Sequence, residues 1–262
     1  MADLLRSAAS GGNWTTKELL AFNIRVVDAN LLVFFGSTEL PAVSANISAT
    51  ILNNLDMPDG NLSKTDRHFF QYLKAAEQSS SKESAVCDFA AFILGMLDYD
   101  DEDRYIRTRK EISFDMAGQR VDAKANMCVM NNLDYLLLIQ EEDECQYFSD
   151  DLEPQLIAAT IAAYYQNNLR RTDAGLDALP TILMPGITMV GTAPTFYRIP
   201  VSPKLLEALV TLTYPQEETI VYRCLPPVPD KQKYASEGMR PLTNRCIVLQ
   251  SFQAFKASLD VI

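Results

Sequence analysis

The sequence lacks most of the side chains from which catalytic sites are commonly built. It contains one histidine, His68, which excludes a two-histidine metal site and the H-E-x-x-H motif. His68 lies in KTDRHFFQYL, a segment typical of an amphipathic helix, and no serine elbow occurs near it. The five cysteines are scattered and form no C-x-x-C pair, so we expect reduced thiols rather than disulfides or a zinc site.

Long apolar runs and the common nucleotide-binding motifs are also missing. No apolar stretch approaches the roughly 20 residues that a membrane-spanning helix requires, and MADLLRSAASGGNW lacks the regions of a signal peptide. The G-x-S-x-G, P-loop and G-x-G-x-x-G motifs do not occur. We therefore expect a soluble, intracellular protein, cytoplasmic or nuclear, with no membrane partner.

Positive charge is scarce. The chain has 34 acidic and 23 basic residues, which gives a formal net charge of −11 at pH 7. A protein-wide attraction to nucleic acid or to an anionic membrane is therefore excluded, and any contact with nucleic acid has to be local. Because 48% of the residues are hydrophobic, the 262 residues are sufficient for a sizeable core, and we expect one domain.

Residues 1–80 are predicted to form a helical N-terminal extension with long loops. Thr15 and Glu18 form one capping box, and Ser63 and Asp66 form a second, each marking the start of a helix. The apolar residues from Leu19 to Val27 are assigned to the first of these helices. Residues 81–225 are expected to form the core, and residues 226–262 a proline-rich loop and a final helix.

The core begins with a predicted helix. In KESAVCDFAAFILGMLDY the apolar residues have the three-and-four spacing of a helix packed along one stripe, and Glu83 lies in its first turn. The basic cluster from Arg104 to Lys110 follows a run of acids, which favours a solvated turn with ion pairs over a phosphate-binding track.

Three strands are predicted next. Apolar residues alternate with polar ones from Val121 to Val129, so Asp122, Lys124 and Asn126 should project from the same face of one strand. Short turn-compatible sequences before and after this strand predict an antiparallel meander. The unbroken apolar run of residues 136–139 is typical of a central strand buried on both faces.

The remaining elements alternate between helix and strand. Pro154 fits the first turn of a helix that continues through IAATIAAYYQNNLRR. The segment TILMPGITMVGTAPTFYRIPV is interpreted as one or two strands joined around Gly191 and Pro194. A helix over residues 203–212, the strand ETIVYRCL and a helix from about Asn244 complete the prediction.

Acidic and amide side chains gather where the predicted strands end. Asp122 or Asn126, on the second strand, should lie beside Glu141 and Asp143 at the end of the third. Hard carboxylate oxygens that share one divalent cation are the arrangement that metal-dependent phosphodiester cleavage requires. Each of these acidic and amide residues also has an interpretation without a functional role. It can belong to a solvated loop edge, to a solvent-exposed face of the sheet or to the start of a helix.

The order helix, three-stranded meander, helix and strand resembles the PD-(D/E)xK phosphodiesterase superfamily, whose restriction-endonuclease-like core is αβββαβ. It also resembles a group of mushroom proteins with that core. The resemblance covers roughly residues 83–201 and implies a mixed α/β fold, with a central mixed sheet flanked by helices. For an active member it also implies a Mg²⁺ cofactor and a nucleic-acid substrate.

Carried over residue by residue, the resemblance assigns Glu141 to the motif acid and Glu83 to the acid that some members supply from the first helix. Gln155 matches the glutamine found early in the following helix of some members. Two positions depart from the motif. Asp143 occupies the place of its lysine, and either Asp122 or Asn126 occupies the place of the second-strand aspartate. Lys124, on the face shared with Asp122, is the candidate to replace the missing cation.

The sequence leaves three functions open, two of which follow from the resemblance. The first is a cleavage-deficient relative that acts as a binding or scaffold module, with nucleic acid at a local site or a protein at the N-terminal helices or residues 225–238. The second is a Mg²⁺-dependent nuclease with Asp122 and Glu141 as ligands, Lys124 near the attacking water and Gln155 as an orienting group. The third is an unrelated α/β small-molecule enzyme that uses PGITMVGTAPTFYRIP as a loop. The sequence specifies no oligomeric state.

Overall fold

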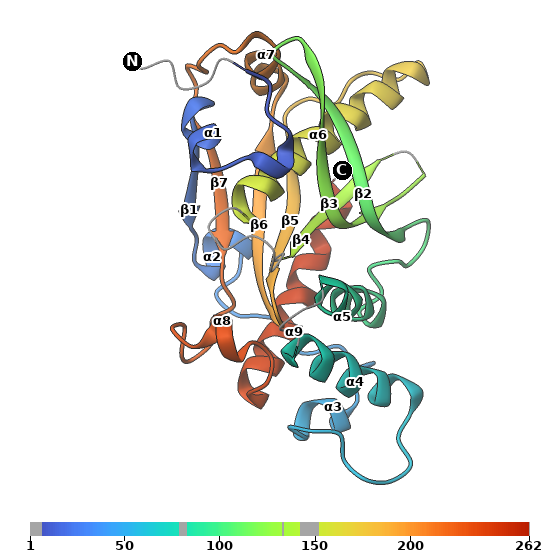
Figure 1. Ribbon diagram of the computed structural model, residues 1–262. Helices are drawn as coiled ribbons and strands as arrows, with labels where there is room; N and C mark the ends of the chain where they lie inside the picture. The colour runs from blue at the N-terminus through green and yellow to red at the C-terminus, as the bar shows by residue number, and fades with distance from the viewer. Residues whose placement is uncertain (1–6, 79–82, 133, 142–151, 262) are drawn as a thin grey trace.

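A seven-stranded mixed sheet forms the centre of the computed structural model (Figure 1). The structure describes residues 7–78, 83–132, 134–141 and 152–261. Across the sheet the strands lie in the order β1-β7-β6-β5-β4-β3-β2. Their bounds are β1 Ile24–Asp28, β2 Tyr105–Met116, β3 Gln119–Met130, β4 Tyr135–Glu141, β5 Ile182–Val190, β6 Ala193–Val201 and β7 Thr219–Cys224.

Helices cover both faces of this sheet, which confirms the predicted mixed α/β class. The α-helices are α1 Thr16–Ala21, α2 Leu31–Phe35, α3 Ala49–Asn53, α4 Lys64–Gln78, α5 Glu83–Met96, α6 Leu152–Asp173, α7 Pro203–Thr211, α8 Tyr234–Glu237 and α9 Leu242–Lys256. Two 3-10 helices, η1 Gly11–Asn13 and η3 Ala257–Val261, lie near the ends of the described chain. Among the described residues, no helix combines the length and apolar character needed to cross a membrane.

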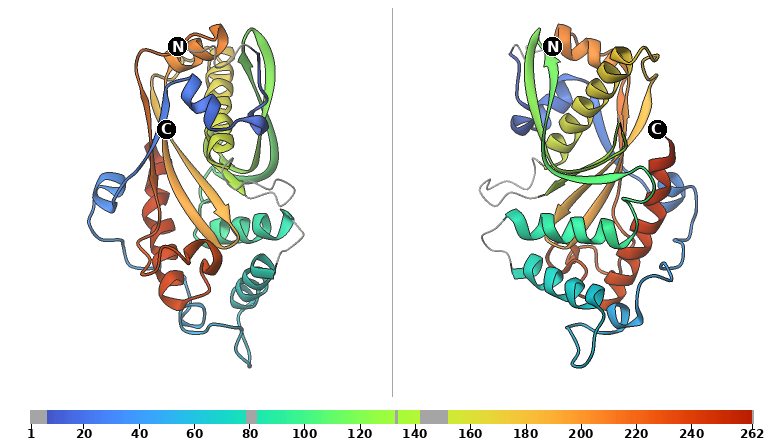
Figure 2. Two further views of the ribbon diagram at one scale, coloured as in Figure 1. Left: turned by 60° about the vertical axis from the view of Figure 1, so that its left-hand side comes forward. Right: turned by 90° about the vertical axis from the view of Figure 1, so that its right-hand side faces the viewer.

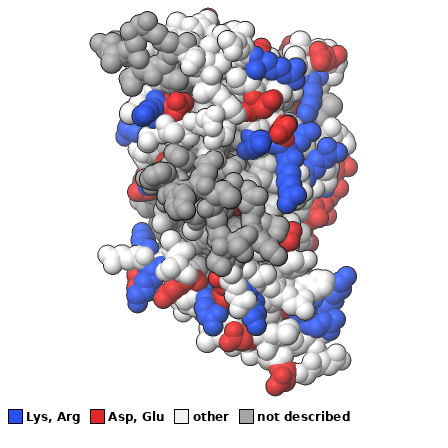
Figure 3. Space-filling model, in the orientation of Figure 1, with Lys and Arg blue, Asp and Glu red and all other residues white. Residues whose placement is uncertain are grey.

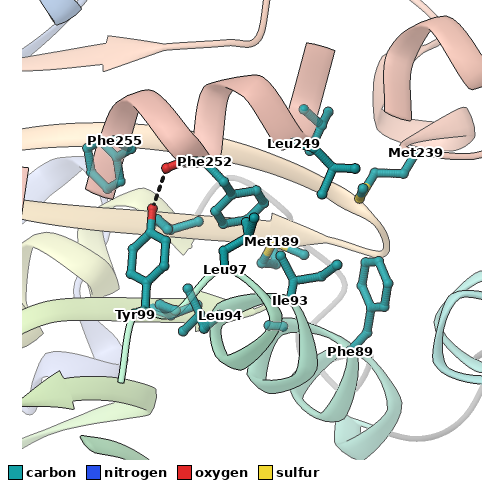
Figure 4. Packing of buried hydrophobic residues seen from close by; sticks show 14 of the residues in the cluster. Phe89, Ile93, Leu94, Leu97, Tyr99, Met189, Met239, Leu249, Phe252 and Phe255 are labelled. Carbon is teal, nitrogen blue, oxygen red and sulfur yellow. Dashed lines mark hydrogen bonds between the residues drawn. The ribbon is translucent and has the colours of Figure 1, made fainter. Parts of the chain in front are cut away.

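The sheet separates two apolar clusters. On one face, α1, α6 and α7 pack against residues such as Leu138 of β4 and Ile199 of β6. On the other face, α4, α5 and α9 pack against residues such as Leu137 of β4 and Phe196 of β6. Figure 4 shows part of this second cluster, where the hydroxyl of Tyr99 donates to the backbone carbonyl of Phe252 at 2.7 Å. β4 contributes to both clusters and is buried along its whole length, as predicted.

The elements α5, β2, β3, β4, α6 and β5 follow one another in the predicted order. β2 pairs with β3 and β3 pairs with β4, both antiparallel, so the meander is confirmed. Its first turn places Ala117 and Gly118 at φ +55° and +68°, the left-handed pair typical of a tight two-residue hairpin. β4 and β5 are parallel, with α6 as the crossover between them.

The predicted helix over residues 19–27 is wrong after Ala21. Asn23 adopts φ +52°, which interrupts the helix, and the next five residues form β1. β1 pairs in parallel with β7 at the edge of the sheet, because its β-branched residues fit an extended pairing better than a helix. The N-terminal segment is therefore not purely helical. Both predicted capping residues are confirmed, since Thr15 and Ser63 accept amide hydrogen bonds at helix starts.

Two further predictions need correction. The basic cluster from Arg104 to Lys110 is not a turn, because β2 already begins at Tyr105. The segment Pro185–Pro200, considered as a loop of a small-molecule enzyme, forms most of the β5–β6 hairpin, with Gly191 in its turn. The predicted strands there and the helix that begins at Pro203 are confirmed, and the final helix starts two residues earlier than expected, at Leu242.

The β2–β3 hairpin is longer than its neighbour β4, and this difference shapes the site. β3 pairs with β4 only between Met127 and Met130, so the rest of the hairpin continues as a two-stranded ribbon. The ribbon curves along α6, as the right-hand view of Figure 2 shows, and both of its strands contact that helix. A pocket lies where residues of this ribbon, the end of β4 and the start of α6 meet.

Candidate functional site

A pocket of about 450 Å³ opens where the β2–β3 ribbon, the end of β4 and the start of α6 meet. Four residues that the sequence analysis singled out line it together: Lys124, Asn126, Glu141 and Gln155. The other described residues of the lining are Ser10, Gly12, Asn13, Arg109, Lys110, Glu111, Ala125 and Gln140. The structure thus brings predicted residues from three elements into one recess.

Asn126 joins the two strands where their backbone pairing stops. The last paired residues are Met127 and Ile139, and beyond them the Asn126 side chain bridges to Glu141. Its amide nitrogen donates to Glu141 Oε1 at 3.1 Å, and its amide oxygen accepts from the Glu141 backbone N–H at 3.2 Å. The side chain thereby substitutes for the missing ladder bonds and holds the buried Glu141 in place.

Gln140 joins β4 to α6 at the same point. Its amide nitrogen donates to Gln155 Oε1 at 3.3 Å, so two residues of the pocket lining are held together. The Gln140 side chain is 7% exposed, and its Oε1 accepts no hydrogen bond from the residues that the structure describes. Glu141 is 4% exposed, so two neighbouring residues of the pocket lining are buried and carry acceptor oxygens.

Arg109 and Lys110 bring positive charge to the pocket. Arg109 adopts φ +52° between the regular pairs Thr108↔Met127 and Lys110↔Ala125, a local irregularity of the ladder. Non-glycine residues held in the left-handed region cluster at functional sites. Neither Arg109 nor Lys110 forms an ion pair with a carboxylate in the described part of the chain. The third cation, Lys124, is largely exposed and lies 3.9 Å from Glu111.

These cations belong to a wider basic strip on the hairpin. We define the basic strip as Arg107, Arg109, Lys110, Arg120 and Lys124. Figure 3 shows Lys and Arg side chains gathered on the side of the molecule formed by β2 and β3, with acidic residues beside them. The strip contrasts with the net charge of −11 of the whole chain and is a local positive region of the kind that an anionic ligand requires.

Asp122 lies outside the pocket. Its carboxylate is exposed and accepts a hydrogen bond from the Ser113 hydroxyl at 2.6 Å, across the hairpin. It lies four positions before Asn126 along β3, a distance of about 13 Å in an extended strand. Asp122 is not among the described residues that line the pocket.

Two predicted residues are not placed. Glu83 is the first residue of α5, but its side chain lies outside the described set. Asp143 also lies outside the described residues, as do its acidic neighbours at positions 142 and 144. Their assignments stay predictions.

The described residues do not fit the predicted magnesium site. They contain no group of three or more His, Cys, Asp or Glu side chains that could hold a metal ion. Among the described residues of the lining, Glu141 is the one buried carboxylate and Glu111 is exposed beside Lys124. The Asn126 side-chain oxygen already accepts a hydrogen bond from the backbone N–H of Glu141. A Mg²⁺ ion prefers several hard oxygen ligands in octahedral geometry, which this set does not supply.

An ionic network anchors the first turn of α6 beside the pocket. Arg223 of β7 donates to Asp28 of β1 at 2.8 Å and to Glu153 of α6 at 3.1 Å. The hydrogen bond from Arg223 lowers the pKa of Asp28. The network ties the sheet edge to the helix that carries Gln155.

Four parts of this site were not predicted from the sequence: Arg109, Lys110, Gln140 and the N-terminal residues. Arg109 and Lys110 stood out as a charge cluster but were assigned to a turn. Gln140 directly follows the apolar run of β4. Its polar side chain after that run was the only signal in the sequence that pointed to a role at the site. Ser10, Gly12 and Asn13 gave no signal, because their place at the pocket depends on tertiary packing alone.

The comparisons with known proteins add no further assignment. No family model matches the chain, and no curated protein matches it either.

Proposed function

We propose that this protein is a nucleic-acid-binding module that does not cleave its ligand. The observation that carries the proposal is the composition of the pocket. Lys124, Arg109 and Lys110 supply positive charge at one recess, while Asn126 presents an amide to Glu141 where cleavage would call for a carboxylate. In this proposal the core still resembles the PD-(D/E)xK superfamily. The residues of this pocket account for the absence of the cleavage reaction of that superfamily.

The basic strip supports binding. Arg109 and Lys110 are not neutralised by ion pairs with the described carboxylates, so a phosphate can approach them without displacing a partner. Because the whole chain carries a charge of −11, the attraction is short-ranged and sensitive to salt. A pocket of about 450 Å³ also has room for a nucleotide-sized group, and small-molecule pockets span roughly 300–1,000 Å³.

Three features argue against cleavage. Asp122 is bonded to Ser113 on the outer ribbon, away from Glu141. The side chain of Asn126 is held by two hydrogen bonds, and its oxygen is already an acceptor for a backbone amide. The residue two positions after Glu141 is an aspartate, where the superfamily motif has a lysine.

Binding is tested by fluorescence anisotropy with labelled single-stranded DNA and RNA over a series of salt concentrations. We expect Arg109→Ala combined with Lys110→Ala to weaken binding. The slope of log affinity against log salt concentration should become shallower by about 0.7 for each phosphate that is no longer neutralised. The matched control is Arg25→Ala combined with Lys204→Ala, two exposed cations on another part of the surface. Equal affinity of both double variants, or no binding by the unaltered protein at low salt, would contradict the proposal.

The alternative, a Mg²⁺-dependent nuclease, is favoured by one observation, the shared position of Lys124, Asn126, Glu141 and Gln155 at one pocket. Incubation of the same oligonucleotides with Mg²⁺ or Mn²⁺ separates the two functions. We expect intact oligonucleotides. Cleavage that disappears in Glu141→Gln would establish the nuclease instead.

A further inference from the structure

Gln140 gives the pocket a second chemical character besides its positive charge. The side chain is more than nine-tenths buried, and its amide nitrogen is already bonded to Gln155. Gln140 lines the pocket, and its buried Oε1 accepts no hydrogen bond from any described residue. Buried acceptors in native proteins are almost always satisfied, so an unpartnered acceptor on a side chain that lines a pocket calls for a donor from outside the chain.

The neighbouring groups define which donor fits. Glu141, next along β4, adds a buried carboxylate to the same lining, and a carboxylate only accepts hydrogen bonds when ionised. The cations Arg109, Lys110 and Lys124 lie on the ribbon side of the same recess. The pocket therefore offers positive charge to an anion on one side and acceptor oxygens to an N–H donor on the other.

We propose that the pocket receives one nucleotide of a bound single strand and prefers a base with an exocyclic amino group (adenine, cytosine or guanine) over thymine or uracil, because an amino N–H donates to Gln140 Oε1. This proposal rests on the proposed function, because the phosphate is held by the cations described above. Thymine and uracil also carry an N–H, but two carbonyl oxygens flank it. Those oxygens would face the acceptors of Gln140 and Glu141 and be repelled.

The preference is tested on the ligand side first. Fluorescence anisotropy compares three oligomers that are identical except at one central position: oligo(dT), oligo(dT) with one adenine, and oligo(dT) with one purine that lacks the 6-amino group. We expect the adenine oligomer to bind about tenfold more tightly than the other two, the effect of one satisfied buried hydrogen bond. This comparison uses the unaltered protein, so it does not depend on how a variant folds.

Gln140→Met supplies the matching test on the protein side, since methionine keeps the side-chain length and removes the acceptor. We expect it to bind all three oligomers equally, with the affinity of unaltered protein for oligo(dT). The control is Gln166→Met, which removes an amide that donates to the Ser113 backbone at 2.7 Å, away from the pocket lining. It should retain the tenfold preference.

The possible failures are distinguishable. Equal binding of the three oligomers by the unaltered protein would overturn the base preference and leave the proposed function intact. A preference that persists in Gln140→Met would overturn the role of Gln140. Absence of binding to every oligomer would overturn the proposed function together with the inference that rests on it.

Discussion

Asn126 and Glu141 are joined by two hydrogen bonds that only an amide can make together. The nitrogen of the Asn126 side chain donates to the Glu141 carboxylate, while its oxygen accepts from the Glu141 backbone. An aspartate at the same place would keep the acceptor and lose the donor. The pair therefore explains why the strand ends stay joined, and why the position does not carry the acid that a metal site would use.

Asn126→Asp should destabilise the protein by about 1–3 kcal/mol at pH 7. The substitution removes a donor from a buried carboxylate and places two negative charges side by side. The repulsion raises the pKa of the acidic pair in the folded state, so the loss is greatest at neutral pH and shrinks as pH falls and one carboxyl binds a proton.

Urea denaturation at pH 7 and at pH 4.5 measures this effect, with the exposed Asp122→Asn as the control. An Asn126→Asp variant as stable as the unaltered protein at pH 7 would show that the two hydrogen bonds contribute little. A gain in its melting temperature on addition of Mg²⁺ would show that one residue separates this pocket from a metal site.

Gly11→Ala should destabilise the protein and disturb the pocket. A Cβ atom at Gly11 would lie 2.5 Å from Ala123 Cβ and 2.9 Å from Ala123 Cα, so the backbone of η1 or β3 has to move. Overpacking of this kind costs typically about 1–3 kcal/mol. The displaced segment also carries Ser10, Gly12 and Asn13, so oligonucleotide binding should weaken as well.

Gly12→Ala is the matched control, because a Cβ atom at Gly12 meets nothing within 4 Å. Urea denaturation and anisotropy on both variants check the prediction. If the two variants behave alike, η1 does not pack on β3 as closely as the structure indicates.

Arg245→Lys should cost about 3 kcal/mol or more in the free energy of unfolding. The Arg245 side chain is fully buried and donates to the backbone carbonyls of Ile51, Asn54 and Met239. A lysine carries a charge but cannot reproduce the planar fork, so buried carbonyls lose their donors. Burial also lowers the pKa of Arg245 to about 10, which marks the desolvation of this cation.

Urea denaturation measures the loss, and Arg67→Lys serves as the control. Arg67 donates to a single carbonyl, that of Leu62, at the surface, so its replacement should change stability by less than about 0.5 kcal/mol. Full stability of Arg245→Lys would show that the charge alone holds α3 to α9.

Cys128 and Cys224 should resist alkylation in the folded protein. Burial raises the pKa of each thiol to about 11, and the thiolate is the reactive form. The half-buried Cys246 should react first. Because thiolate increases about tenfold per pH unit below the pKa, labelling of Cys128 should accelerate between pH 7 and pH 9.

Iodoacetamide labelling followed by peptide mass analysis checks this order in a Cys145→Ser background, since Cys145 lies outside the described residues. Labelling in urea, where every thiol is exposed, is the control. Rapid modification of Cys128 at pH 7 under native conditions would mean that β3 opens readily.

Much of the core could be predicted because its signals are local. Alternation along residues 121–129, the apolar run at 136–139 and the proline at position 154 each depend on neighbours in sequence, and each prediction is confirmed. The helix over residues 19–27 failed because the β-branched residues of β1 are stabilised by β7, almost 200 residues away in sequence. The turn predicted for residues 104–110 failed because the pairing of β2 with β3 outweighed the local charge pattern.

The sequence by itself determined the element order from α5 to β5, the absence of a catalytic histidine set and the acidic net charge, since these follow from composition and short-range pattern. Tertiary structure decided which of the candidate polar residues meet. It placed Asp122 on the outer ribbon, joined Asn126 rather than Asp122 to Glu141, and brought Gln140 into the lining of a pocket with Arg109 and Lys110. The physical reason is that β3 extends beyond its pairing with β4. Where the two strands are no longer paired, their side chains contact elements that are distant in sequence.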